Sequence, residues 1–507
     1  MVIKNKIKRY FELYQFELFN VAIILGGIFI RLFQLDWRSF WLDEARLANI
    51  IVKDDFEQVF NIDLYSGFAF PPPLFTSIIH LISNTFGPNE YNLRFLSAFA
   101  GILCIPFVYI LSKRFFDQYT ATIALFLCSF NSIFIFYSRE LKQYTIEALF
   151  TLLAIYFAEK VVENDNKRTF LFLFLICLLS FGFAHSFIFI FPIISIYVYV
   201  NVIRKHSRYS SLALLNLIFG FVFFSIYYWF FLKYYISNEI IEYWSESYVD
   251  YSSISNFIWW HFNKSHLLLS YYCSFPEALG ILHEIWILIF LSIFFLGIVI
   301  CYKYRSRLLI YLIGPLCLTY LAAWLQKYPV APRTYLFILP LLLIIIAVGI
   351  RNLQLILKKK LGTSFFTPVL IFLLAFCYTL KPIYKYIIFY DKEYMRVEQL
   401  RPVLEKIKSE ISDNDFVNVH PRASIAYEFY KNILNKRVLH GNIKDSSFYD
   451  INKRVWIIFS HLNESQRKEC IKAISNKREL LLTIFEPGAS AYLFDVPMTK
   501  VETLIDT

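Results

Sequence analysis

The stretch Tyr335–Ile350 reads YLFILPLLLIIIAVGI and contains no charged side chain. A helix needs about 20 predominantly apolar residues to cross the hydrocarbon core of a bilayer, and this stretch approaches that length. Comparable apolar stretches recur along the first three quarters of the chain, separated by short polar segments. The pattern predicts a polytopic integral membrane protein, with the lipid bilayer as its first partner.

The composition supports this prediction. Of the 507 residues, 58% are hydrophobic, 20% are aromatic and only 18% are charged, whereas soluble domains carry about 25% charged residues. The net charge of +11 comes from short basic clusters between apolar stretches, which is how membrane topology is encoded, so we expect no nucleic-acid partner. The eight cysteines are scattered without a CxxC spacing, which favours neither disulfides nor a zinc site.

The apolar stretches predict a mainly α-helical bundle of about eleven transmembrane helices. The N-terminal stretch lacks a small-residue cleavage site and is therefore interpreted as the first span. The spans are expected near residues 18–35, 93–111, 121–137, 144–162, 170–184, 187–202, 212–232, 285–301, 308–325, 335–350 and 366–380.

The basic clusters predict the orientation of these spans. If the spans alternate, all six clusters fall on one side, which the positive-inside rule identifies as the cytoplasm. The clusters are Lys4–Arg9, Lys113–Arg114, Lys167–Arg168, Arg204–Arg208, Lys303–Arg307 and Arg351–Lys360. We therefore expect a multi-pass protein of the cell membrane with a cytoplasmic N-terminus. Residues 36–63, 237–280 and the tail would lie outside.

The tail alternates strand-like and helix-like segments, which predicts a small extracytoplasmic α/β domain at 391–507 after a transmembrane domain at 1–390. The expected strands are Asp415–Val419, Arg454–Ser460, Glu479–Ile484 and Ala491–Val496, and the expected helices are Val397–Glu410, Ser424–Leu434 and Ser465–Ser475. No internal repeat is visible, which argues against a transporter built from inverted repeats.

The first outer loop carries an acidic pair in the segment Ser39–Arg46, SFWLDEAR. A carboxylate at the membrane surface can act as a general base or as a metal ligand. The alternative is a helix N-cap, because Asp followed by Glu commonly opens a juxtamembrane helix. From this segment alone the N-cap is somewhat favoured.

A second polar segment, Tyr137–Tyr144 (YSRELKQY), lies between two apolar stretches on the same predicted side. A charged group at the centre of a membrane helix costs about 2.5–3.5 kcal/mol, so such groups usually face a cavity or each other. A turn whose long side chains extend to the interface is an equally good interpretation.

Isolated outer-side groups complete the set of candidates. Arg94, Lys327 and Arg333 would suit a phosphate or diphosphate. His80 follows the prolines of Pro71–Pro73 on an expected interfacial helix, where a structural role is more common.

The D-x-D at Asp413–Asp415 precedes a strand, which favours an Asx turn over a metal site. There is no P-loop or GxGxxG after a strand, so the sequence gives no support for nucleotide chemistry.

Taken in order, these segments resemble the GT-C membrane glycosyltransferases, in particular the family 39 group related to protein O-mannosyltransferases and the lipid A aminoarabinose transferase. The resemblance covers roughly Leu18 to Ile350. Its segments are Phe40–Glu44 (FWLDE), Pro72–His80, Leu93–Gly101, Tyr109–Arg114, Tyr137–Tyr144 and Arg333–Pro340, and the tail adds Arg454–His461 and Gly488–Asp495.

The chain departs from the family pattern at several positions. Arg139 stands where glutamine is usual, Lys142 where arginine is usual, and Gln143 where methionine is usual. Phe70 replaces a histidine that often precedes the prolines. Because lysine lacks the bidentate fork of arginine, phosphate binding is expected to differ in detail.

The resemblance implies transfer of a sugar from a polyprenyl-phosphate donor to an extracytoplasmic glycan, lipid or protein. It implies that Asp43 is the general base and that Glu44, also catalytic, and Glu140 position the substrate or hold a divalent metal. It leaves open whether a metal is needed. The implied donor-phosphate cations are Arg94, Arg139, Lys142 and Arg333, and the implied cavity residues are Arg46, His80, Tyr137, Glu140, Gln143 and Tyr144. A lipid-linked-sugar flippase or a non-catalytic envelope scaffold remains the alternative.

Overall fold

The computed structural model describes residues 2–53, 56–60, 71–164, 166–233, 238–275, 279–304, 306–361, 374–379, 398–434, 438–440 and 453–497. The chain forms two compact units. The first unit comprises residues 1–33, 57–81 and 94–389, and the second comprises 34–56, 82–93 and 390–507. The second unit thus includes two segments that the sequence analysis assigned to the transmembrane domain.

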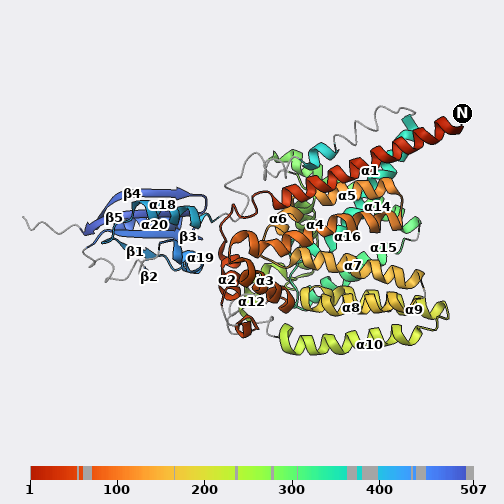
Figure 1. The fold of residues 1–507 in the computed structure, drawn as a ribbon, viewed down its shortest axis with the longest axis horizontal. Coiled ribbons are helices and arrows are strands. Elements are labelled where there is room, and N and C mark those ends of the chain that lie inside the picture. Colours follow the sequence, from red (N-terminus) through yellow and green to blue (C-terminus); the bar gives the residue numbers. More distant parts are fainter. Residues whose placement is uncertain are drawn as a thin grey trace, which may run out of the picture. The chain divides into compact units, whose positions relative to one another are not determined.

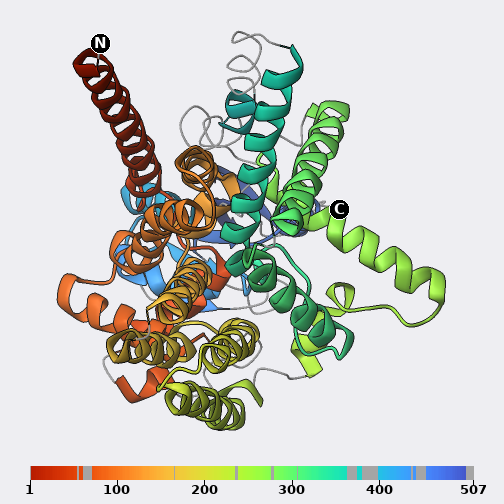
Figure 2. The ribbon, with the colours of Figure 1, turned by 90° about the vertical axis from the view of Figure 1, so that its right-hand side faces the viewer.

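The first unit is a helical bundle (Figure 1). Its helices include α1 (Val2–Leu32), α5 (Gln118–Phe130), α6 (Ser132–Ser138), α7 (Tyr144–Glu163), α8 (Lys167–Phe183), α9 (Phe187–Arg204), α10 (Ser210–Tyr227), α13 (Ile254–Tyr272), α14 (Ile281–Lys303), α15 (Leu308–Trp324) and α16 (Leu339–Leu361). Parts of α3 (Pro73–Phe86) and α4 (Glu90–Phe115) belong to each unit. The helices α7 to α10 lie side by side in Figure 1, and Figure 2 views them nearly end-on.

Each of the first ten predicted spans coincides with a helix or a helix pair of this unit. Within the described residues, five helices are long and apolar enough to cross a membrane, or six if α5 and α6 form one bent span. Other expected spans fall on shorter helices, such as α8 and α15 with 17 residues each. The chain is a multi-pass membrane protein. The expected span at 366–380 lies outside the described residues except for 374–379.

The expected span 121–137 is not one continuous helix. The helices α5 and α6 are bent by 56° at Asn131. Asn131 has an extended backbone (φ −66°, ψ 120°), and its side-chain oxygen accepts the amide of Phe134. Its amide nitrogen donates to the Tyr272 carbonyl at 3.0 Å. The break arises because asparagine caps a new helix inside an apolar run.

Arg31, at the end of α1, binds the carbonyls that this break releases. The last carbonyls of a helix have no partner within that helix. The guanidinium of Arg31 donates to Ser129 O at 2.8 Å and Cys128 O at 3.0 Å, at the end of α5, and its Nε donates to Ser138 Oγ at 3.3 Å. Arg31 is fully buried. The cation therefore joins α1 to both halves of the bent pair.

Two glycines allow α14 and α16 to approach closely. A Cβ on Gly297 of α14 would lie 2.1 Å from the carbonyl oxygen of Ile345, and one on Gly349 of α16 would lie 2.1 Å from that of Ile293. Small residues at such crossings are the usual way in which membrane helices pack backbone to backbone.

The second unit contains a five-stranded sheet in the order β2-β1-β3-β5-β4. The strands are β1 (Phe416–Val419), β2 (Val438–His440), β3 (Val455–Ser460), β4 (Arg478–Glu486) and β5 (Ala489–Pro497). β1 runs parallel to β2 and β3, while β5 runs antiparallel to β3 and β4. The four predicted strands correspond to β1, β3, β4 and β5. The three-residue β2 was missed, because so short a strand shows no period.

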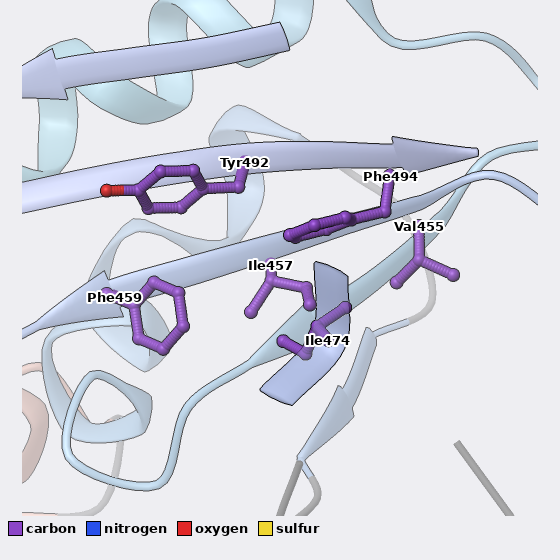
Figure 3. Packing of buried hydrophobic residues seen from close by; sticks show 6 residues of the cluster. All are labelled: Val455, Ile457, Phe459, Ile474, Tyr492 and Phe494. Carbon is purple, nitrogen blue, oxygen red and sulfur yellow. The ribbon is translucent and has the colours of Figure 1, made fainter. Parts of the chain in front are cut away.

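The helices of this unit are α2 (Leu42–Ile51), α18 (Leu400–Glu410), α19 (Ser424–Tyr430) and α20 (Glu464–Ser475). One apolar cluster combines β3, β5 and α20 (Figure 3): Val455, Ile457, Phe459, Ile474, Tyr492 and Phe494. The helix α2, from the segment that follows α1, packs against α19, from the tail. The segment with the acidic pair is therefore built into the same unit as the sheet.

Candidate active site

The acidic pair opens α2. The N-cap residue of this helix is Trp41, which makes no side-chain capping hydrogen bond, and Asp43 and Glu44 both lie in the first helical turn. Neither carboxylate is thus the N-cap that the simpler interpretation suggested. Acidic groups in a first turn still interact favourably with the helix N-terminus, so position alone does not separate a structural role from a chemical one.

Burial separates the two carboxylates. Successive residues of a helix point about 100° apart, because 3.6 residues complete one turn. Glu44 is fully buried and accepts a hydrogen bond from Arg38 Nη2 at 3.3 Å, in an ion pair. Asp43 is half-buried, as is Arg46, which lies three residues further along and shares a face with it. Asp43 is therefore the accessible carboxylate of the pair.

The second polar segment forms the turn between α6 and α7 in the first unit. Glu140 and Gln143 are buried, with 2% and 8% exposed, while Arg139 and Lys142 are half-buried. The rings of Tyr137 and Tyr144 contact each other edge-on, with centroids 5.1 Å apart. Burial of the polar side chains favours the inward-facing interpretation over long side chains that extend to the membrane surface.

Arg139 has a structural contact that the sequence did not indicate. Its Nη1 donates to the carbonyl oxygens of Ile30 at 2.8 Å and Phe33 at 2.7 Å, at the end of α1. A cation at a helix C-terminus satisfies free carbonyls and favours the helix dipole. At least this nitrogen of Arg139 is therefore engaged with the end of α1.

Arg94 lies on α4, which contacts this turn through Ser97. Ser97, on the same face of α4 one turn later, donates through Oγ to the carbonyl of Lys142 at 2.7 Å. Thr145 returns a hydrogen bond from its Oγ1 to Ser97 O, also at 2.7 Å. Arg94 is fully buried. Two hydrogen bonds thus fix the part of α4 that carries Arg94 against the turn that carries Lys142.

The remaining predicted residues of the first unit lie on other elements. The guanidinium of Arg333 stacks over the ring of Trp244, 4.5 Å from its centroid, in a loop whose Pro332 carbonyl accepts from Tyr272 Oη at 2.8 Å. His80 is buried within α3, with 4% exposed. Asp43, Glu44 and Arg46 belong to the second unit.

The described residues contain no group of three or more His, Cys, Asp or Glu side chains arranged to hold a metal ion. Asp415 of the D-x-D segment accepts from Arg454 Nε and Nη2, each at 2.8 Å, and from the Ser412 amide at 2.9 Å. Burial raises the pKa of Asp415, but these hydrogen bonds outweigh it and the pKa is lowered. This carboxylate therefore closes a turn by accepting an amide three residues earlier, which differs from an Asx turn, where the side chain binds an amide two residues further on.

Sequence reasoning missed three buried side chains of the second unit that contact the segment before Asp43: Glu398, Gln399 and Tyr430. Their partners are backbone amides, which leave no signature in a sequence. Arg31 was also missed, because one arginine near the end of an apolar run looks like an ordinary flank.

Comparison with known proteins supports the predicted resemblance. Residues 71–229 match the family described as dolichyl-phosphate-mannose-protein mannosyltransferase. No curated protein sequence is significantly similar to the chain.

Among solved structures, ArnT from Cupriavidus metallidurans bound to undecaprenyl phosphate superposes with a TM-score of 0.53 at 12% identity, covering 94% of this chain and 97% of that one. The apo state of the same protein gives 0.52 at 12% identity, covering 95% and 98%. The oligosaccharyltransferase of Archaeoglobus fulgidus in complex with Zn and sulfate gives 0.48 at 12% identity, covering 87% and 67%. The chain is therefore a multi-pass membrane protein with the fold of ArnT, and its residues 71–229 carry the signature of the dolichyl-phosphate-mannose-protein mannosyltransferase family, which confirms the resemblance to GT-C enzymes.

Proposed function

We propose that the protein transfers a sugar from a polyprenyl-phosphate donor to an extracytoplasmic acceptor, with Asp43 as general base. The observation that carries the proposal is the difference in burial and partners between the two carboxylates of the acidic pair. Glu44 is buried in an ion pair with Arg38, whereas Asp43 remains half-exposed in the first turn of α2. The family match and the ArnT fold support the same chemistry.

The reaction balances as a single displacement. The acceptor hydroxyl loses its proton to the Asp43 carboxylate as its oxygen forms a bond to the anomeric carbon of the donor. The bond from that carbon to the phosphate oxygen breaks, and polyprenyl phosphate leaves with the electron pair. The carboxylate also stabilises positive charge that develops at the anomeric carbon, as in glycoside hydrolysis.

The phosphate that leaves needs cations. Arg94 and Lys142 are the best candidates, because the Ser97 and Thr145 hydrogen bonds hold their elements together. Arg333 and Arg139, whose guanidinium groups contact Trp244 and the end of α1, would be secondary. Groups fixed in advance around a developing charge are more effective than mobile ones, because they need no reorganisation during the reaction.

An apolar pocket in the first unit offers a place for a lipid tail. It has a volume of about 230 Å³ and is lined almost wholly by apolar side chains of α1, α5, α14 and α16, together with residues 374–378. Phe126, Trp286 and Phe290 are among them. We propose that such a pocket accommodates isoprenoid units of the donor.

We predict that Lys142→Gln lowers kcat for sugar transfer by about 100- to 1,000-fold, the usual effect of removing one fixed charge-stabilising group. Lys142→Arg should retain much of the activity. Lys408→Gln, which removes an exposed lysine of α18, is the matched control and should leave kcat unchanged. Steady-state kinetics on purified variants would measure this. Equal losses for Lys142→Gln and Lys408→Gln would exclude a specific phosphate contact by Lys142.

We also predict that the N-terminus is cytoplasmic and the C-terminal sheet extracytoplasmic, because the basic clusters alternate with the spans. Alkaline phosphatase, which folds only in an oxidising compartment, should be active when fused after residue 507 and inactive when fused after Arg204. The opposite activities would reverse the orientation and place Asp43 in the cytoplasm, where a nucleotide sugar would be available.

The function itself is tested with purified protein in lipid nanodiscs, a panel of polyprenyl-phosphate hexoses and pentoses carrying labelled sugar, and an envelope extract as acceptor source. Transfer of label into the extract supports the enzyme. A flippase predicts movement of intact donor across a vesicle without consumption, and a scaffold predicts neither movement nor consumption. The concentration of polar groups in one turn and on one short helix favours the enzyme.

A further inference from the structure

The helix that carries Asp43 does not cap itself. Trp41 occupies the N-cap position and has no side-chain oxygen to accept the first amides of the helix. The first amides of any helix need an acceptor from outside it. Here the amide of Leu42, the first residue of α2, donates to Glu398 Oε2 at 3.2 Å. A carboxylate from the other end of the chain thus provides the cap.

The residues before Leu42 are held in the same way. The Ser39 amide donates to Gln399 Oε1 at 2.9 Å, and the Ser39 hydroxyl donates to the same oxygen at 3.1 Å. The Phe40 amide donates to Tyr430 Oη at 2.8 Å. Three of the four amides between Ser39 and Leu42 are therefore bound by side chains of the tail.

These acceptors are themselves fixed. His461 Nδ1 lies 2.6 Å from Glu398 Oε1, and the Ser460 hydroxyl donates to Oε2 at 3.4 Å. Tyr430 donates its own proton to Glu90 Oε1 at 2.7 Å. His461 has a φ of 58°, a left-handed conformation that costs energy in a residue other than glycine and persists only where the surroundings enforce it. The left-handed backbone conformation at the end of β3 thus brings His461 against Glu398.

Burial makes the arrangement rigid. Glu398, Gln399 and Tyr430 are 6%, 2% and 5% exposed. Water can replace a lost acceptor only at an exposed site. If one of these buried side chains were removed, the amide that it binds would therefore lose its hydrogen bond. Asp43 directly follows Leu42, so a shift of Leu42 would move Asp43 as well. A displacement of a reacting group by about 1 Å can lower the reaction rate about 100-fold.

We propose that Glu398 and Tyr430 are positioning residues that hold α2 so that Asp43 faces its substrate, and that the tail is a structural part of the catalytic site. The inference rests on the proposed function of Asp43. It differs from a role of the tail in acceptor recognition, because it predicts an effect on the turnover of every acceptor. A merely structural role would lower stability without a specific effect on kcat.

The test compares Glu398→Ala, Tyr430→Phe and Glu398→Gln, with Glu428→Ala, which changes an exposed residue of α19, as control. Hydrogen–deuterium exchange of peptides over residues 39–46 reports the cap without any assay of activity. We expect about 5- to 30-fold faster exchange there in Glu398→Ala and Tyr430→Phe. The glutamine variant, which keeps an acceptor oxygen, should restore slow exchange.

Kinetics, measured well below the unfolding temperature, decide the catalytic part. We expect kcat to fall about 10- to 100-fold in Glu398→Ala and Tyr430→Phe with little change in KM for the donor, and to recover in Glu398→Gln.

Unchanged exchange would overturn the cap, and faster exchange with unchanged kcat would overturn the positioning role. If the wild-type protein transfers no sugar but exchange is still faster in the variants, the proposed function is overturned, and the catalytic role with it. The cap would stand in that case. If Glu398→Ala does not fold, Tyr430→Phe, which removes one oxygen atom, carries the test.

Discussion

Asp43→Asn is expected to lower kcat for sugar transfer by about 100- to 10,000-fold, the range in which a positioned general base contributes. Asparagine keeps the shape of the side chain but cannot accept the proton of the acceptor hydroxyl. The fold should be preserved, because Asp43 is half-buried and the first turn of α2 is held by other residues. Steady-state and single-turnover kinetics in nanodiscs would measure the loss.

Glu44→Gln is the matched control for this experiment. Glu44 has the same chemistry and adjoins Asp43, but it is buried against Arg38. Removing its charge leaves Arg38 without its buried counter-ion, so the expected effect is loss of stability, with a smaller effect on kcat. If Glu44→Gln abolished turnover while Asp43→Asn left it intact, the base would be Glu44 and the assignment from burial would be wrong.

Arg31→Met is expected to destabilise the folded protein by about 3 kcal/mol or more, the effect of deleting a buried charged donor whose partners cannot reach water. Arg31 is fully buried and donates to carbonyls of Gly27, Cys128 and Ser129. Methionine fills a similar volume but removes the donors that Arg31 supplies to the carbonyls of Cys128 and Ser129. Thermal unfolding of the detergent-solubilised protein would show a lower midpoint.

Lys113→Met, at an exposed lysine on α4, provides the control for removing a charge from the bundle. It should leave the unfolding midpoint close to that of the wild type. Arg31→Lys should fall between the two, because one ammonium cannot reach all the partners of a guanidinium fork. An Arg31→Met protein as stable as the Lys113→Met protein would show that the bend at Asn131 does not depend on this cation.

The sequence predicted the regular elements because their periods are strong. Apolar runs located ten helices or helix pairs of the first unit, and alternation located β1, β3, β4 and β5 to within two residues at each end. The bend at Asn131 escaped prediction, because one asparagine inside an apolar run resembles any polar residue in a buried helix. The helix α2 was expected only as an alternative to a chemical role for Asp43, and the structure places Asp43 in its first turn, half-buried.

The candidate site was predicted unevenly. The polar segment from Tyr137 to Tyr144 is visible because charges are rare between apolar runs. The sequence could not predict that Arg139 binds the end of α1 or that Glu398 caps α2, because both pairings use backbone groups. Such contacts depend on how distant elements pack. The residues that hold a site in place are therefore harder to find from sequence than those with reactive side chains.

The most direct test of the central claim follows the lipid product of the reaction. Purified wild-type protein and Asp43→Asn are incubated with a polyprenyl-phosphate sugar and acceptor extract, and the lipids are identified by mass spectrometry. Transfer of the sugar alone predicts polyprenyl phosphate from the wild type, in step with label in the acceptor, and unchanged donor from the Asp43→Asn variant. Free polyprenol would indicate transfer of a sugar phosphate and contradict the proposed bond cleavage. Unchanged donor in every wild-type reaction, with folded protein and the full donor panel, would contradict the claim that the protein is a transferase of this class.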